Sequence, residues 1–263
     1  MFSELNNILN NSPEQGECVL LCDSQTDGNF LVHHFLSFYL KGGCKVCFLG
    51  LIQSFSHYSL VAQKLGVNLP AARQQGQLVF MEGLRSSLDL LLTHEPEGTA
   101  TQSESPLQFL SSPGADLRSL YRFVRTSLSP SPGSGWKFPV LIVDDLSVLL
   151  SLGVSTTNIL SFIHYCRASI CSQLQGNVVV LAHDDADSED EENELLVKSL
   201  QHQSHLTLRA EGLVTGYCKD IHGQLKITLR SPLPGRNTTK VFQYKIQDKN
   251  VSFFARGTSP AVL

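Results

Sequence analysis

Five short apolar runs in the first 183 residues constrain the fold more than any other feature of this chain. Each is a nearly unbroken series of Val, Leu, Ile, Cys and Phe, without alternation of apolar and polar residues. Such runs are typical of parallel strands covered on both faces, and the segments between them have the apolar spacing of helices. Strands are expected at Glu17–Cys22, Cys44–Gly50, Gln77–Gly83, Val140–Asp145 and Asn177–His183, and helices at Gly28–Leu40, Ser54–Leu65, Asp116–Ser127 and Thr156–Leu174.

After Gln201 the pattern changes to alternating apolar and polar residues, which is typical of antiparallel strands. His222–Gly223 and residues 248–250 have the composition of hairpin turns. No repeat and no shift in composition divides the 263 residues, so we expect one α/β domain over residues 1–263. It combines a mostly parallel sheet, flanked by helices, with C-terminal antiparallel hairpins. Flexible segments are expected near residues 93–114, 129–137 and 184–194, where polar residues, Gly and Pro gather.

The composition argues against a membrane or secreted protein. No apolar run approaches the roughly 18 residues that span a bilayer, and the N-terminus has no basic segment followed by an apolar one. The seven cysteines lie mostly within apolar runs, and Cys44 and Cys47 fall inside one expected strand without a second pair at zinc spacing. Buried, reduced thiols fit this better than a metal or redox site, so we expect a cytoplasmic protein, with the nucleus as a further location.

The junction after the first expected strand occupies the place of a phosphate-binding P-loop. A working P-loop needs two glycines, a lysine and a Ser or Thr hydroxyl; the matching positions here hold Asp23, Gly28, Asn29 and Phe30. Asp23 and Asp27 would each repel a phosphate by about 4 kcal/mol at ~4 Å and an effective dielectric of ~20. We therefore expect this loop to bind no nucleotide in the ordinary manner.

The strand "VLIVDD" resembles a Walker B segment, since Asp144 and Asp145 follow four apolar residues. An alternative is that these aspartates cap the next helix. RecA-like ATPases also need a Glu after the second strand, but no Asp or Glu lies between Cys44 and Met81. With the lysine, the hydroxyl and the base all missing, we expect no catalytic residues and no cofactor.

The histidines do not form an obvious metal site. His33 and His34 lie in the first expected helix, and His183, His202 and His205 are scattered, without partners at ligand spacing. We therefore expect no metal.

The charges are unevenly distributed along the chain. Residues 184–194 hold 8 of the 24 acids and no base, which leaves 16 acids against 20 bases elsewhere. That run is a solvated tract, a screen against nucleic acid, or a contact for a basic partner.

Arg118, Arg122 and Arg125 recur along one face of an expected helix. They form either a solvated face or a contact for RNA or a partner.

The order of these segments, with "MFSELNNIL" at the start, "LVHHFLSFYLKGG" after the first strand and "VLIVDD" later, resembles the sixth-subunit family of the eukaryotic Elongator complex over essentially the whole chain. The resemblance implies a RecA-like fold in a heterohexameric ring with the fourth and fifth subunits, which binds tRNA and docks on the catalytic subcomplex that modifies the wobble uridine. It implies a non-catalytic role, since Asp23, Asn29 and Phe30 depart from a P-loop. The alternative is a subunit that handles ATP at an interface completed by a neighbour's lysine or arginine.

Overall fold

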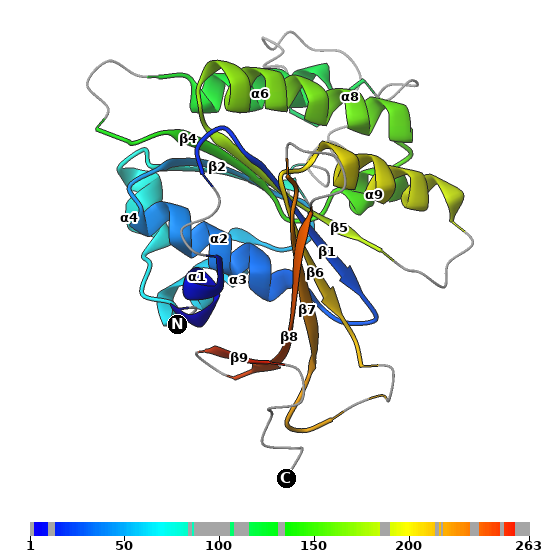
Figure 1. Ribbon diagram of the computed structural model, residues 1–263. Helices are drawn as coiled ribbons and strands as arrows, with labels where there is room; N and C mark the ends of the chain where they lie inside the picture. Colours follow the sequence, from blue (N-terminus) through cyan, green and yellow to red (C-terminus); the bar gives the residue numbers. More distant parts are fainter. Residues whose placement is uncertain are drawn as a thin grey trace, which may run out of the picture.

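The computed structural model describes residues 3–9, 14–83, 86, 106–107, 116–130, 135–184, 190–213, 216, 218–231, 237–247 and 250–255. Within these residues one sheet of nine strands has the order β3-β2-β4-β5-β1-β6-β7-β8-β9 (Figure 1). The strands are β1 (Cys18–Ser24), β2 (Lys45–Gly50), β3 (Leu78–Glu82), β4 (Pro139–Val143), β5 (Asn177–His183), β6 (Leu206–Glu211), β7 (Gly223–Leu229), β8 (Thr238–Ile246) and β9 (Val251–Ala255).

The sheet is parallel from β3 to β6 and antiparallel from β6 to β9. β1 is central: Leu20 pairs with Val180 of β5 on one side and with Thr207 of β6 on the other. The antiparallel part begins where Thr207 pairs with Thr228 of β7. The expected α/β class, with a mostly parallel sheet and C-terminal antiparallel strands, is confirmed.

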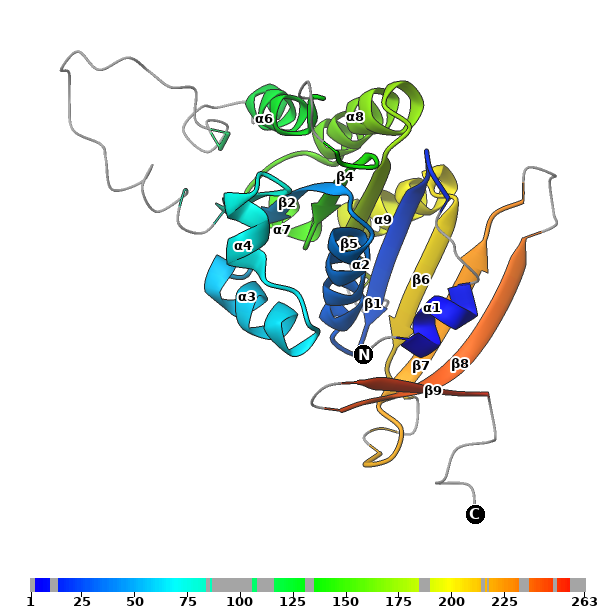
Figure 2. The same ribbon diagram turned by 90° about the vertical axis from the view of Figure 1, so that its left-hand side faces the viewer.

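Helices cover both faces of the parallel part (Figure 2). Side chains of β1 alternate between the two layers: Val19 and Leu21 face one, and Leu20 and Cys22 face the other. The first layer holds α1 (Ser3–Leu9), α2 (Asn29–Lys41), α3 (Phe55–Lys64) and α4 (Leu69–Gln74). The second holds α6 (Arg118–Leu128), α7 (Ser147–Ser151), α8 (Thr156–Cys166), which continues as the π-helical η2 (Arg167–Gln173), and α9 (Glu191–Gln203).

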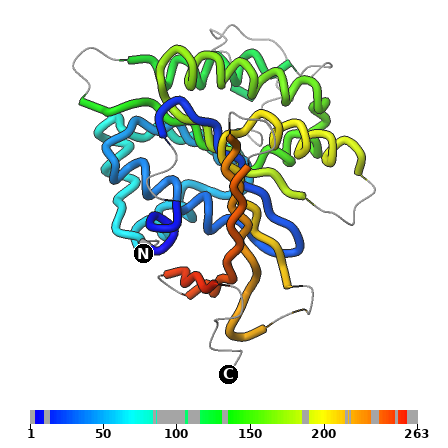
Figure 3. Tube along the Cα trace, viewed as in Figure 1, coloured from blue at the N-terminus to red at the C-terminus, as the bar shows by residue number. Residues whose placement is uncertain are grey.

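The N-terminal and C-terminal parts of the described chain meet beside the antiparallel strands. In the tube of Figure 3, α1 near the N-terminus runs beside β9 near the C-terminus. Glu4 of α1 accepts a hydrogen bond from the backbone N–H of Phe253 in β9, at 2.8 Å. Because β9 is an edge strand, this contact satisfies one of its outward-pointing donors.

The five apolar runs all form strands, and the four expected helices all form. Ser155 caps α8, since its side chain accepts the N–H of Asn158, and Gly66 follows α3 with a positive φ of 76°. Leu107, within the segment expected to be loose, is buried against the second layer. Apart from residues 106–107, the segment 93–114 lies outside the described residues, as does part of 129–137.

Two expectations are wrong. The acidic run is not loose throughout: Asp190 caps α9, and Glu191, Glu192 and Glu194 form its first turn, where acids suit the helix dipole. Residues 185–189 lie outside the described chain. His222–Gly223 is not a turn, because β7 begins at Gly223. A Cβ there would lie 2.4 Å from the carbonyl oxygen of Glu211, so close approach of two strands requires this glycine.

All seven cysteines are free thiols and all but Cys218 are buried, as expected. Burial raises the pKa of Cys18 to about 11 and that of Cys47 to about 12, so these thiols are unreactive at neutral pH. None of the helices described has the length and hydrophobicity that crossing a bilayer requires.

Candidate functional site

The junction between β1 and α2 is filled by a side chain of the loop itself. Asp23 is only 2% exposed, and its Oδ2 accepts the backbone N–H of Gly28 at 2.8 Å. A Cβ on Gly28 would lie 2.8 Å from the Cβ of Asp23, so no other residue fits there without rearrangement. Asp27 is exposed and accepts the N–H of Asn29 at 2.8 Å. The chain's own carboxylates thus take backbone donors that a P-loop would offer to phosphates.

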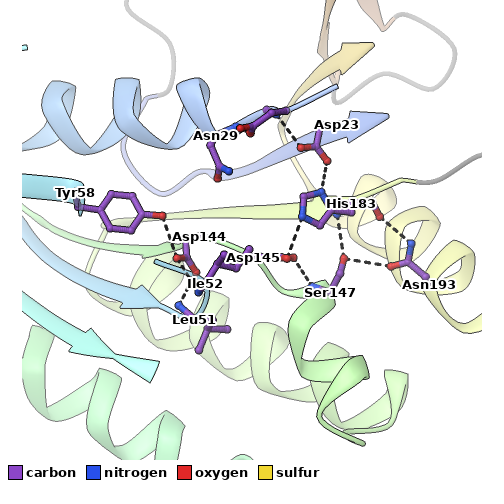
Figure 4. A network of polar contacts seen from close by, with 12 residues as sticks. Asp23, Asn29, Leu51, Ile52, Tyr58, Asp144, Asp145, Ser147, His183 and Asn193 are labelled. Atoms are coloured by element: carbon purple, nitrogen blue, oxygen red, sulfur yellow. Dashed lines mark hydrogen bonds and ion pairs between the residues drawn. The ribbon is translucent and has the colours of Figure 1, made fainter. Parts of the chain in front are cut away.

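A histidine at the end of β5 joins Asp23 to Asp145. The Nδ1 atom of His183 contacts Oδ1 of Asp23, and its Nε2 lies 3.1 Å from Oδ2 of Asp145 (Figure 4). Hydrogen bonds to Asp145 and then to Asp23 raise the pKa of His183 to about 10, against the opposing effect of burial. His183 is therefore an imidazolium at neutral pH and balances the two buried carboxylates. We call Asp23, His183 and Asp145 the carboxylate–histidine bridge.

Two further side chains fix this bridge to the second helical layer. Asp145 Oδ1 accepts the N–H of Ser147, the first residue of α7, at 2.7 Å. The hydroxyl of Ser147 accepts the N–H of His183 at 3.0 Å and donates to Asn193 Oδ1 at 3.2 Å. Asn193, in α9, donates in turn to the carbonyl of His183 at 2.8 Å. The bridge is thereby connected to α7 and α9 as well as to β1, β4 and β5.

Asp144 points away from the bridge and has a structural environment of its own (Figure 4). It is fully buried and accepts three hydrogen bonds, from the backbone N–H groups of Leu51 (2.7 Å) and Ile52 (3.2 Å) and from the Tyr58 hydroxyl (3.0 Å). Burial raises the pKa of Asp144 to about 6 even against these donors. Asp144 thus ties β4 to the segment between β2 and α3, where a Walker B aspartate would instead face a magnesium ion.

The remaining P-loop positions lack the lysine and the hydroxyl that hold phosphate and magnesium in a P-loop. Asn29, at the lysine position, is half-buried. Phe30, at the hydroxyl position, is buried, with its ring centroid 5.0 Å from that of Tyr244 in β8. In the described part of the chain, no group of three or more His, Cys, Asp and Glu side chains could hold a metal ion.

The structure does not bring the three arginines of α6 to this junction. They lie on the outer side of the second layer, and all three are exposed, whereas Leu120 and Val124 face the core. Arg118 pairs with Asp116 at 2.9 Å and its side chain is 84% exposed. The helix face is as expected, and its role stays a prediction.

The roles of His183, Asn193 and Tyr58 were not predicted from the sequence. His183 lies 160 positions from Asp23, so no local spacing links the two. One signal was available: a histidine ends the strand that, in this fold, lies beside the first strand. Its side chain then meets the residue at the end of that first strand.

The fold is shared with solved structures of low sequence identity. An uncharacterized protein of Pyrococcus horikoshii, solved with an unknown peptide, superposes with a TM-score of 0.59 at 10% identity, over 96% of each chain. A KaiC-like protein of the same archaeon gives a TM-score of 0.54 at 14% identity, over 91% of this chain and 90% of that one. These similarities confirm the expected RecA-like fold.

Curated sequences are similar over the entire chain. "Elongator complex protein 6" of Homo sapiens is 59% identical over 272 aligned positions, and that of Danio rerio is 55% identical over 271, each covering 100% of both chains. The one from Dictyostelium discoideum is 24% identical and covers 92% of this chain. The family model described as "Elongation complex protein 6" matches residues 2–248. The chain therefore belongs to the Elongation complex protein 6 family.

Proposed function

We propose that this chain is a non-catalytic, RecA-like subunit of the Elongator complex, present in the cytoplasm and also in the nucleus. Its partners are the fourth and fifth subunits, in a heterohexameric ring, and the catalytic subcomplex. The ring binds tRNA and supports modification of the wobble uridine. Membership of the family supports the assignment to the complex. The single observation that supports a non-catalytic role is the carboxylate–histidine bridge.

The bridge opposes nucleotide binding in two ways. A triphosphate at this junction would compete with Asp23 for the N–H of Gly28, which that carboxylate already accepts at 2.8 Å. It would also lie against a buried carboxylate whose counter-charge, His183, is shared with Asp145. Displacing Asp23 would leave a charge buried without its partner, at a cost of several kcal/mol.

The test is to assemble the ring with the fourth and fifth subunits and titrate ATP while measuring turnover. Asp144→Asn keeps the shape of the Walker-B-like residue and removes its charge, and Asp116→Asn, on the surface, is the matched control. We expect both rings to bind and hydrolyse ATP like the wild type. A selective loss in the Asp144→Asn ring, with assembly intact, would favour a shared interfacial nucleotide site. Failure of the chain to co-purify with other Elongator subunits would refute the proposal altogether.

The arginine face of α6 is proposed as a contact for tRNA or a partner. Reversing the charge of Arg118, Arg122 and Arg125 should change ring assembly or tRNA affinity, because all three side chains are exposed on one helix face. Reversal of Lys64 in α3, measured by native mass and tRNA titration, is the control. If neither quantity changes, the face is only solvated.

A further inference from the structure

A large polar groove lies on the second-layer side of the antiparallel strands, apart from the carboxylate–histidine bridge. It has a volume of about 1150 Å³ and is lined by the end of α9, by η2 and by β6 and β7. The floor is a sheet face whose side chains alternate: Leu225 and Ile227 are buried toward the first layer, whereas Lys226 is exposed. Thr228 and Arg230 follow on the same side as Lys226 because strand side chains alternate with a period of two. This face is therefore polar and accessible in the chain alone.

Positive charge gathers at one end of the groove. Arg167 and Arg230 line this end, together with Glu17, whereas Lys226 lies farther along the groove, opposite Arg209 in the pairing of β6 with β7. Burial lowers the pKa of His205, and the positive charges of Arg167 and Arg230 lower it further. Both guanidiniums therefore lie close to the His205 ring. At the other end Arg209 is neutralised by Asp184 and Glu211. An anionic ligand is therefore favoured at the end that contains His205.

Hydrogen-bond donors at this end lack acceptors within the described chain. Arg167 gives one N–H to Gln203 Oε1 at 3.0 Å, but its buried Nε has no partner there. His205 Nδ1 accepts the backbone N–H of Cys18 at 3.1 Å. In the neutral ring the proton is therefore on Nε2, which is a donor. The Nε2 donor of the exposed His205, beside the positive charges of Arg167 and Arg230, would therefore stabilise an anion that supplies oxygen atoms here.

The spacing of the cations favours an extended polyanion over a single phosphate. Lys226 and Arg230 are four residues apart on one strand direction, which separates them by about 13 Å at ~3.3 Å per residue. Two imidazole rings, those of His202 and His205, are exposed and line the same groove. Unpaired bases stack on such rings, a contact that the carboxylates of an acidic peptide do not make. A nucleic-acid strand alternates phosphates and bases, so it matches both the spaced cations and the exposed imidazole rings of the groove.

We infer that this groove, with Arg167, Lys226 and Arg230 on the phosphates and His202 and His205 against bases, binds a single-stranded segment of RNA. The inference extends the proposed function, because it places an RNA contact on this chain itself. The proposed function supplies only the identity of that RNA, which would be tRNA. The groove itself is inferred independently of it.

The first test measures the salt dependence of binding by the full-length chain, with a fluorescent 12-nucleotide oligouridylate as the probe. Each lost phosphate contact reduces the slope of log K against log salt by about 0.7 for a single strand, so Lys226→Gln/Arg230→Gln should reduce it by about 1.4. The control Lys64→Gln/Lys240→Gln removes the same charge from exposed positions, one on α3 and one on the opposite face of β8. Equal slopes in the variant and the control would overturn the inference.

The second test separates RNA from an acidic protein ligand. His202→Ala should weaken oligouridylate binding about fivefold or more, which corresponds to the loss of one stacked base, with thermal melting unchanged. Polyglutamate of equal charge should compete poorly. Competition as strong as that of RNA would identify an acidic polypeptide site and overturn the inference.

Assembly is scored separately, by co-purification with the fourth and fifth subunits. Normal assembly of the Lys226→Gln/Arg230→Gln chain with weaker oligouridylate binding supports the groove. Lost assembly with unchanged oligouridylate binding would make the groove a protein interface. A wild-type chain that binds the oligouridylate but fails to co-purify would contradict the proposed function and leave the groove supported.

Discussion

Replacing His183 by glutamine removes the charge at the centre of the carboxylate–histidine bridge while leaving a polar side chain of similar length. Asp23 and Asp145, both 2% exposed, would then have no counter-charge. Each would keep one backbone donor, from Gly28 at 2.8 Å and from Ser147 at 2.7 Å. The chain should still fold, but with a smaller free energy of unfolding.

The size of this loss follows from the contacts. Two hydrogen bonds to charged groups contribute about 1.5–3 kcal/mol each. The side chain of His183 is 39% exposed, so water screens part of that energy, and glutamine restores part of the hydrogen bonding. We expect a net loss of about 2–3 kcal/mol at pH 7, which lowers Tm by about 4–12 °C for a domain of this size.

The pH dependence provides a second signature. The pKa of His183 is raised from 6.5 to about 10, so its stabilisation is complete below pH ~6.5 and is lost as pH rises toward 10. The difference in Tm between wild type and His183→Gln should therefore shrink between pH 6.5 and 9.5. Asp23→Asn/His183→Gln should be more stable than His183→Gln alone, because it removes one of the unpaired charges.

Thermal melting followed by circular dichroism measures the loss in Tm, its dependence on pH and the Tm of the double variant. His164→Gln, at an exposed position of α8, is the matched control. The reasoning is refuted if His183→Gln melts within about 1 °C of the wild type. A gap in Tm between wild type and His183→Gln that widens at high pH would refute the charge balance as well.

Three further predictions concern single contacts. Tyr58→Phe should reduce the free energy of unfolding by about 1–2 kcal/mol, because Asp144 loses one of three donors; an unchanged denaturant midpoint would contradict this. Asp190→Ala should cost about 1 kcal/mol, since its side chain accepts the N–H groups of Glu192 and Asn193; no effect would mean that the acidic run does not cap α9. Gly28→Ala should cost about 1–3 kcal/mol through its clash with Asp23, and Asp23→Gly should relieve it; equal loss in both backgrounds would place the strain elsewhere.

The core of the fold was predictable because burial leaves a direct record in the sequence. β5 is buried on both faces at every position from Val178 to Ala182, so its residues form a continuous apolar run. α9 was missed for the opposite reason. Its first turn is acidic, and acids are common both in solvated loops and at helix N-termini, so the run alone did not distinguish them. Gly223 was misplaced because glycine serves turns and close strand contacts equally well.

The site was harder to predict than the fold. The sequence places Asp23 and Asp145 at the ends of two strands, but the partner that neutralises them comes from β5, which lies between β1 and β4. Strand order is a tertiary property, and the local pattern of "NVVVLAH" is equally compatible with a surface histidine. The cation that offsets Asp23 is His183, which no local pattern around Asp23 indicates.

The coupling within the bridge also restricts what mutation can do to this junction over evolutionary time. Replacing Asn29 by lysine would add a cation beside an internal anion, Asp23, that already occupies the loop. Removing Asp23 first would leave His183 with one carboxylate fewer, and removing His183 first would leave two buried acids unbalanced. Losing either Asp23 or His183 alone thus gives a less stable protein, because the charges of the bridge balance one another. The bridge therefore opposes a stepwise change of this junction into a phosphate site.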